Sequence, residues 1–400
     1  MSLGIYISVP FCRTKCSYCN FASDVFSRAV FEHYVDRVCA DIGNTQETAR
    51  EMGGRIEREV DSIYLGGGTP TVLEPDQLLR MFEAVRSQFS VAGGAEITVE
   101  CAPGTLTPFM LDTLPRCGVN RVSLGVQSFI DQEAASVGRL HKKATVLDDV
   151  SRLRAAGITN INIDLIAGLP HQTAESWHES LSQAIATGAP HVSVYMLEVD
   201  EDSRLGRELI AGGTHYHAHF VPDEDTTADF YLTACEALER GGIAQYEISN
   251  FAGNGFESRH NLKYWTRQPY LGFGVDAHSM LFSVAKELEA VRFATADSLE
   301  KYIAGTLVQK TEVSSIVALE ESFFLGLRLN RGVNLRPLKD KFGVPMLADF
   351  RRTIVEQCEL GLLEQKDDII RLTPRGRLLS NEVFEAFLIY DHIRDNRVSV

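Results

Sequence analysis

The chain has 400 residues, of which 44% are hydrophobic and 23% charged, a composition typical of a globular domain and not of a disordered chain. Its formal net charge of −15 argues against general binding to nucleic acid, because phosphate contacts need a basic surface. No apolar run approaches the roughly 20 residues that a membrane-spanning helix requires, and residues 1–10 run directly into a strand pattern. We therefore expect no membrane span, no signal peptide and a cytoplasmic location.

The first half of the chain alternates short apolar strands with amphipathic helices. The strand candidates are rich in Val, Ile and Leu with little polar alternation, as is typical of parallel strands covered on both faces. They are IYISVP from Ile5, SIYLGGGTP from Ser62, EITVEC from Glu96, RVSLGVQ from Arg121, INIDLIAGLP from Ile161 and HVSVYML from His191. Six β-α units in a row predict an α/β fold with right-handed crossovers. A doubly wound sheet would fit this pattern too, but polar or glycine-rich strand ends favour a partial (β/α)6 barrel, similar to an incomplete TIM barrel.

The second half of the chain has a different pattern. Residues 200–290 are irregular and rich in Gly, His and aromatic residues. From about residue 315 the pattern predicts an apolar helix, two short helices, a two-strand wing and a final helix, which is a winged-helix-like α+β arrangement. We expect it to pack against the barrel or a partner protein, and we do not expect it to bind DNA. The predicted domains are a barrel over residues 1–290 and a winged-helix-like domain over residues 291–400.

Three cysteines cluster in VPFCRTKCSYCNF, directly after the first predicted strand. Cys12, Cys16 and Cys19 have the spacing C-x3-C-x2-C. Cysteine thiolates hold iron–sulfur clusters, and a cubane normally takes four, so three thiolates would leave one iron open to another ligand. A zinc site completed by a distant His or Cys, or unreactive buried cysteines, are the alternatives. Zinc sites usually contain a second C-x2-C pair, and this sequence has none.

This loop, with the six β-α units that follow it, resembles the radical S-adenosylmethionine (SAM) superfamily. The resemblance implies a [4Fe–4S] cluster on the three cysteines, whose open iron binds the amino and carboxylate groups of SAM. It also places GGGTP, from Gly66 to Pro70, beside the amino group of SAM. Carboxylates suit ribose hydroxyls and an arginine suits a carboxylate, so we expect polar residues near the strand ends to complete the site. The expected SAM-binding residues are Tyr6, Tyr18, Gly67, Gly68, Thr69, Glu100, Gln127, Arg139 and Asp164.

Further strings narrow the resemblance: GVQSF, GRLHKK, NIDLIAGLPHQT, YEISNFA and SRHNLKYW. With GGGTPT they resemble the oxygen-independent coproporphyrinogen III oxidase family over about residues 4–390. This family has a decarboxylating oxidase branch and a branch of heme chaperones called HemW. The oxidases have a fourth cysteine where this chain has Phe21, and a long N-terminal arm that we expect to be absent, because Tyr6 already belongs to the first strand. HNLKYW matches the H-N-x-x-Y-W string associated with heme binding in HemW.

The resemblance therefore favours a HemW-like heme chaperone. It implies heme binding through His260, Asn261 and Trp265, and delivery of heme to an acceptor protein that the sequence does not identify. A neutral imidazole is a good iron ligand, and an indole can pack on a porphyrin. The same residues would also suit a loop whose aromatic side chains fill the core. The alternative function is an enzyme, either coproporphyrinogen III oxidase or another radical SAM enzyme acting on tetrapyrroles, although Phe21 argues against oxidase activity.

Overall fold

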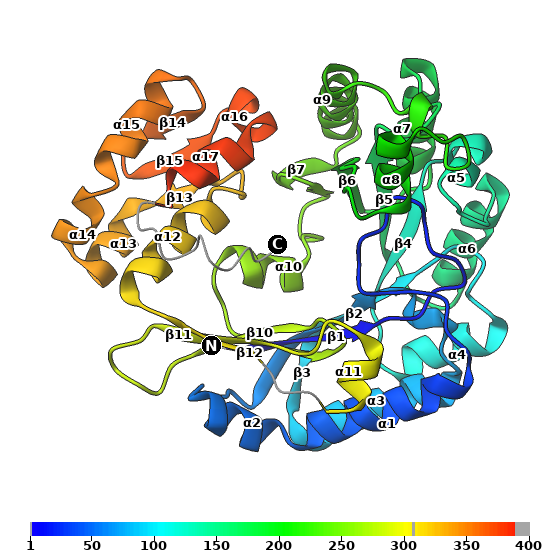
Figure 1. Cartoon of the computed structure of the whole chain (residues 1–400), viewed down its shortest axis with the longest axis horizontal. Helices are drawn as coiled ribbons and strands as arrows, with labels where there is room; N and C mark the ends of the chain where they lie inside the picture. The colour runs from blue at the N-terminus through cyan, green and yellow to red at the C-terminus, as the bar shows by residue number, and fades with distance from the viewer. Residues whose placement is uncertain (1, 306–308, 389–400) are drawn as a thin grey trace.

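The computed structural model describes residues 2–305 and 309–388, and its main element is a sheet of twelve strands (Figure 1). The strand order is β12-β11-β10-β9-β1-β2-β3-β4-β5-β6-β8-β7, so the sheet is not closed. Strands β1 to β6 are parallel and adjacent in chain order, which confirms the predicted partial (β/α)6 barrel. These strands are β1 Leu3–Val9, β2 Glu59–Gly67, β3 Ser90–Cys101, β4 Arg121–Gln127, β5 Asn160–Ala167 and β6 His191–Met196.

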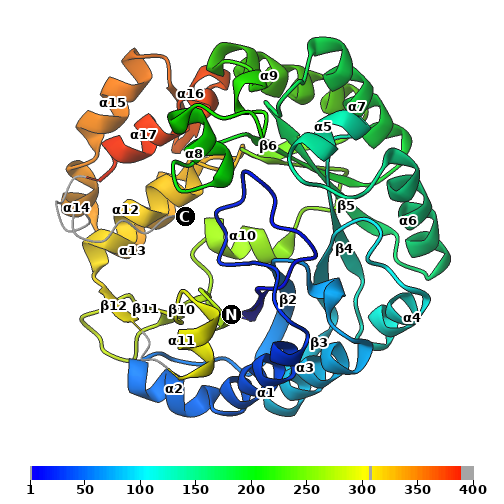
Figure 2. The same ribbon diagram turned by 45° about the vertical axis from the view of Figure 1, so that its right-hand side comes forward.

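Helices cover the outer face of this sheet, and Figure 2 shows them surrounding it while the loop that follows β1 crosses the inside. They are α1 Ala29–Gly43, α2 Thr45–Met52, α3 Pro75–Gln88, α4 Pro108–Arg116, α5 Asp131–Ser136, α6 Lys143–Ala155 and α7 Ala174–Ala186. Local signals define several of their ends. For example, Thr173 and Ser176 form a capping box at the start of α7, which satisfies backbone N–H groups that have no partner within the helix.

The section after β6 contributes to both edges of the sheet. At one edge, β8 Asn250–Ala252 pairs with β6, and β7 Ala244–Glu247 pairs with β8, both antiparallel. At the other edge, β9 Tyr270–Gly274 lies parallel to β1, and three antiparallel strands extend the sheet from β9. These are β10 His278–Phe282, β11 Ala290–Ala294 and β12 Gln309–Val313. The helices of this section are α8 Arg204–Ala211, α9 Glu224–Arg240, α10 Arg259–Trp265 and α11 Leu299–Ile303, with a 3-10 turn at Ala218–Phe220 between α8 and α9. A second 3-10 turn, Pro70–Val72, follows β2.

The C-terminal part forms a small helical domain with a small sheet, as predicted, but the sheet has three strands where the sequence predicted a two-strand wing. Its elements are α12 Ser315–Gly326, β13 Val333–Asn334, α13 Leu335–Phe342, α14 Val344–Ala348, α15 Arg351–Glu359, β14 Leu363–Lys366, β15 Ile369–Leu372, α16 Pro374–Leu378 and α17 Ser380–Ala386. The segment predicted as two short helices contains three, because Gly343 has φ 86° and Pro345 follows it in the first turn of α14. Phe323, Phe350 and Phe387 stack in a separate core.

The C-terminal domain contacts both edges of the open sheet. Glu321 on α12 is 1% exposed and forms ion pairs with Arg267 at 2.7 Å and with Arg292 of β11 at 2.8 Å. At the other edge, the backbone of Glu247 in β7 forms an isolated antiparallel β-bridge with that of Leu329, just after α12. The segment around α12 therefore lies across the opening of the barrel. Strands β11 and β12 lie within the predicted C-terminal domain or at its border, yet they belong to the large sheet. The domain boundary after residue 290 stays a prediction. In the described part of the chain, no helix has the length and apolar character needed to cross a membrane.

Candidate cofactor site

A cavity of about 370 Å³ opens at the carboxyl ends of the parallel strands and continues into the barrel. Its rim contains the cysteine loop and the ends of β2 to β6, while its floor reaches Arg121 at the start of β4 and Asn261 of α10. The carboxyl ends of parallel strands are where α/β folds build their sites, because the loops that follow the strands converge there.

The three loop cysteines, Cys12, Cys16 and Cys19, all line this cavity and are free thiols. The glycine-rich turn after β2 holds their loop in place: the backbone N–H of Gly68 donates to Val9 O at 2.8 Å, and that of Thr69 to Phe11 O at 2.8 Å. On its other side the loop is anchored at the end of α5, where the Ser17 N–H donates to Val137 O at 3.2 Å. Hydrogen bonds on two sides therefore fix the position of the cysteine loop.

The glycines of GGGTP are required by close approach. A Cβ on Gly66 would lie 2.7 Å from Glu100 Oε1, and a Cβ on Gly68 would lie 2.7 Å from the carbonyl oxygens of Val9 and Phe11. Gly67 has φ 94°, a conformation that favours glycine. Substitution at any of these glycines would therefore displace the cysteine loop or the cavity wall.

Two partly buried carboxylates, Glu100 and Asp164, line the wall of the cavity. Glu100 accepts a hydrogen bond of 2.8 Å from the Tyr64 hydroxyl, and burial raises the pKa of its carboxyl to about 7. Asp164 accepts from Ser123 Oγ at 2.9 Å and from Asn162 Nδ2 at 2.7 Å, and burial raises its pKa as well. Both are half-buried acceptors suited to hydroxyl or amino groups of a ligand.

Two further predicted residues have buried polar atoms that find no partner among residues 2–305 and 309–388. Arg139 Nε and Gln127 Oε1 are buried without a partner, and both side chains line the cavity. The Arg139 Nη2 atom lies 3.4 Å from the Tyr18 hydroxyl. Gln127 has φ 69°, an unusual conformation for a residue other than glycine that turns the chain at the end of β4. A buried group without a partner is costly, so a ligand that supplies partners would stabilise this arrangement.

These features fit a cubane cluster and SAM. Three thiols stand together at the rim of a cavity that also supplies two acceptors and an arginine. Within residues 2–305 and 309–388, no three His, Cys, Asp or Glu side chains converge as ligands of a single metal ion. A cubane does not need such convergence, because each thiolate binds a different iron. The set therefore suits a cluster better than one zinc ion.

Tyr6 and the HNLKYW string lie deeper in the barrel. Of His260, Asn261 and Trp265, all in the described part of the chain, only Asn261 lines the cavity. The Tyr6 ring is half-buried, 6.2 Å from the Tyr64 ring, and its hydroxyl approaches Gly67 without lining the cavity.

The His260 ring is 1% exposed, and both of its nitrogens have partners. Its Nδ1 lies 3.0 Å from Ser62 Oγ, and its Nε2 lies 2.8 Å from the Tyr264 hydroxyl. Burial lowers the pKa of this imidazole to about 3, so it is neutral, as an iron ligand must be. The Trp265 ring packs under the Arg328 guanidinium, whose carbon lies 4.3 Å from the ring centre. Binding of iron by His260 would require one of its two hydrogen bonds to be exchanged.

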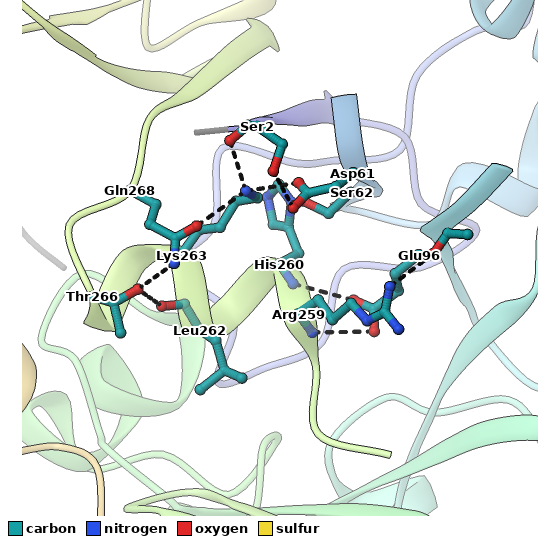
Figure 3. Close-up of polar contacts among 11 residues, drawn as sticks. Ser2, Asp61, Ser62, Glu96, Arg259, His260, Leu262, Lys263, Thr266 and Gln268 are labelled. Atoms are coloured by element: carbon teal, nitrogen blue, oxygen red, sulfur yellow. Dashed lines mark hydrogen bonds and ion pairs between the residues drawn. The ribbon is translucent and has the colours of Figure 1, made fainter. Parts of the chain in front are cut away.

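Helix α10 is held against the barrel strands by the polar contacts drawn in Figure 3. Lys263 is 2% exposed, and its Nζ contacts Asp61 Oδ1 at 2.7 Å and the carbonyl oxygen of Ser2 at 2.9 Å. At the start of the helix, Glu96 of β3 accepts from the backbone N–H of Arg259 at 3.1 Å and of His260 at 3.2 Å. Ser2, β2 and β3 thus hold α10 in place through hydrogen bonds and the Lys263–Asp61 ion pair.

Sequence reasoning missed the polar residues on the inner face of the barrel. They occur on strands and were not selected as site residues, although Asn162 and Asn250 lie within strings quoted above; they are Arg121, Ser123, Asn162, Ser193 and Asn250. The period-2 alternation of a strand carries a signal for them, because residues 121, 123, 125 and 127 share one face. Choosing that face as the cavity face requires knowing the curvature of the sheet.

Comparison with known proteins identifies the family of this chain. The Radical SAM superfamily model matches residues 6–184, and the HemN C-terminal domain model matches residues 313–379. The heme chaperone HemW of Bacillus subtilis is 33% identical over 390 residues, which cover 96% of this chain and 98% of that protein. HemW of Escherichia coli is 29% identical and covers 96% of this chain and 98% of that protein.

Among solved structures, the coproporphyrinogen III oxidase HemN of Escherichia coli, a radical SAM enzyme, has the same fold. It matches with a TM-score of 0.80 and 23% identity, over 96% of this chain and 90% of that one. Membership of the radical SAM superfamily implies a [4Fe–4S] cluster and SAM, which the cysteine loop and the cavity fit. Because its similarity to HemW extends over nearly the whole length of both proteins, the chain belongs to the HemW family of radical SAM proteins.

Proposed function

We propose that this protein is a heme chaperone, which binds heme and delivers it to an acceptor protein. The observation that carries the proposal is its similarity to HemW over 96% of the chain. Phe21, at the position of the fourth cysteine in the oxidase branch, agrees with it, since its side chain is 64% exposed beside the loop and provides no thiol. We place the protein in the cytoplasm, where its free cysteines would stay reduced.

In this proposal Cys12, Cys16 and Cys19 hold the cluster, and the cavity holds SAM. When bound, the cluster would supply an electron and SAM an organic radical precursor. Glu100 and Asp164 would accept from hydroxyl or amino groups of SAM, because both are acceptors on the cavity wall. Arg139 would meet a carboxylate with its planar guanidinium. Whether SAM is consumed or regulates transfer is a question for turnover measurements.

The proposed heme site involves helix α10, through His260, Asn261 and Trp265. Asn261 is already at the cavity floor, whereas His260 is bound to Ser62 and Tyr264. Heme binding would therefore exchange a hydrogen bond of His260 for a bond to iron, with a movement of α10. We expect His260→Ala to shift the Soret band and weaken heme binding, while the matched control His219→Ala, an exposed histidine, leaves both unchanged.

One sample tests this function against its alternative, oxidative decarboxylation of coproporphyrinogen III, for which the shared fold with HemN is the supporting observation. Protein reconstituted anaerobically with iron and sulfide is titrated with heme, followed by its Soret band. The same sample then receives coproporphyrinogen III, SAM and a reductant. We expect heme binding, transfer of heme to apomyoglobin as a generic acceptor, and no protoporphyrinogen IX. Phe21→Cys should not create turnover. Porphyrinogen turnover by the wild-type protein, or failure to bind heme, would contradict the proposal.

A further inference from the structure

Arg121 carries a buried positive charge that forms no ion pair with the described part of the chain. Its side chain lines the cavity floor and is 1% exposed. Within residues 2–305 and 309–388 its guanidinium forms no hydrogen bond or ion pair, and its Nε is buried without a partner. By contrast, a second buried arginine, Arg267, which is 8% exposed, forms an ion pair with Glu321. A buried cation without a partner is costly, so the Arg121 site is incomplete without a ligand.

The neighbours of Arg121 leave room for polar contacts but do not neutralise it. Thr98 of β3 and Asn160 of β5 stand opposite Arg121 in the parallel register, and each has a buried side-chain oxygen without a partner. The carboxylates of Glu100 and Asp164 lie further along the same strands, where the Arg121 charge opposes the rise of their pKa without an ion pair. The floor of the cavity therefore holds the Arg121 cation and polar oxygens for which the described residues supply no partner.

Arg121 is also distant from the cysteine loop. It starts β4, and Gln127 ends β4 beside the loop. At about 3.3 Å per residue, the backbone of the two is separated by about 20 Å. On the floor, Arg121 faces the same cavity as Asn261 of α10. A ligand group that reaches Arg121 thus approaches the base of the barrel and the string proposed for heme.

We propose that Arg121 binds a carboxylate of a ligand on the cavity floor. The planar guanidinium pairs two N–H groups with both oxygens of a carboxylate, which a lysine ammonium cannot do. Two ligands of the proposed function carry such a group: heme, through its propionates, and SAM, through its methionyl end. Because Asn261 of the proposed heme string lines the same cavity, a propionate is favoured, and this part of the inference rests on the proposed function.

The experiment compares Arg121→Met with the wild type in cluster-reconstituted protein. Heme affinity is measured by Soret titration with heme and with its dimethyl ester, which lacks the propionate charges. SAM affinity is measured by equilibrium dialysis with SAM and with decarboxylated SAM. Arg121→Lys keeps the charge without the planar fork and provides a second variant if Arg121→Met does not fold. Arg80→Met, on the outer helix α3, is the matched control.

We expect Arg121→Met to weaken heme binding by about tenfold to a hundredfold, the range for a lost charge-assisted pair, and to leave the affinity for the dimethyl ester unchanged. Loss of affinity for SAM, but not for decarboxylated SAM, would assign the carboxylate to SAM instead. If both variants bind both natural ligands as the wild type does, Arg121 is no carboxylate site. If the wild type binds no heme, the proposed function fails, and the SAM measurements still decide on Arg121.

Discussion

Replacement of Glu100 by Gln tests whether burial of the ionised Glu100 carboxyl in the cavity wall lowers the stability of the folded protein. Burial raises its pKa from 4.5 to about 7, so the folded protein keeps the proton over a pH range in which the unfolded chain has lost it. The stability associated with the protonated form is complete below pH 4.5 and is lost as the pH rises through 7. At 1.36 kcal/mol per pKa unit the full loss is roughly 3 kcal/mol, and about 2 kcal/mol after allowing for partial exposure to solvent.

Glu100→Gln keeps the size of the side chain and an oxygen that can accept from Tyr64, but it never ionises. We therefore expect the variant to be more stable than the wild type by about 2 kcal/mol at pH 8, with a much smaller difference at pH 5. Anaerobic urea unfolding of the two proteins at both pH values, followed by circular dichroism, measures the difference. The exposed Glu239, changed to Gln, is the control. The same variant should bind SAM more weakly, since it has lost a charged acceptor.

A difference in unfolding free energy that does not depend on pH would refute this reasoning, because the burial cost applies only to the ionised carboxyl. A wild type more stable than Glu100→Gln at pH 8 would refute it as well. It would mean that the ionised group is stabilised in place, with Arg121 as the nearest candidate for its partner.

Three further changes have defined outcomes. Cys16→Ala should abolish the cluster in iron analysis and electron paramagnetic resonance, whereas Cys235→Ala, on an outer helix, should retain about four irons per chain; a normal cluster in Cys16→Ala would remove the loop as its site. Asp164→Asn should lower SAM affinity about tenfold or more at normal iron content, and unchanged affinity in dialysis would place Asp164 outside the site. Glu321→Gln leaves its two arginine partners unpaired, so the midpoint of urea unfolding should fall by the equivalent of about 3 kcal/mol; an unchanged midpoint would show that the C-terminal domain docks by its apolar contacts alone.

The strands and the cysteine loop could be predicted from the sequence because their signals are local. Parallel strands covered on both faces are continuous apolar runs, so β1 to β6 were identifiable. The spacing of Cys12, Cys16 and Cys19 is a property of one short segment, as is the glycine run that fastens it. The break between α13 and α14 also has a local signal, at Gly343 and Pro345, but the apolar spacing of the whole segment outweighed it.

The cavity floor and the closure of the barrel were decided by the tertiary structure. Arg121 starts a strand, a position that commonly faces solvent, and it is buried here because the sheet curves around its side chain. His260 was predicted as an iron ligand from its string, yet the packing of α10 against β2 gives it Ser62 as a partner, 198 residues away in the chain. Such contacts join residues that no local pattern relates, since they depend on how far the sheet curves and on which edge each later segment joins.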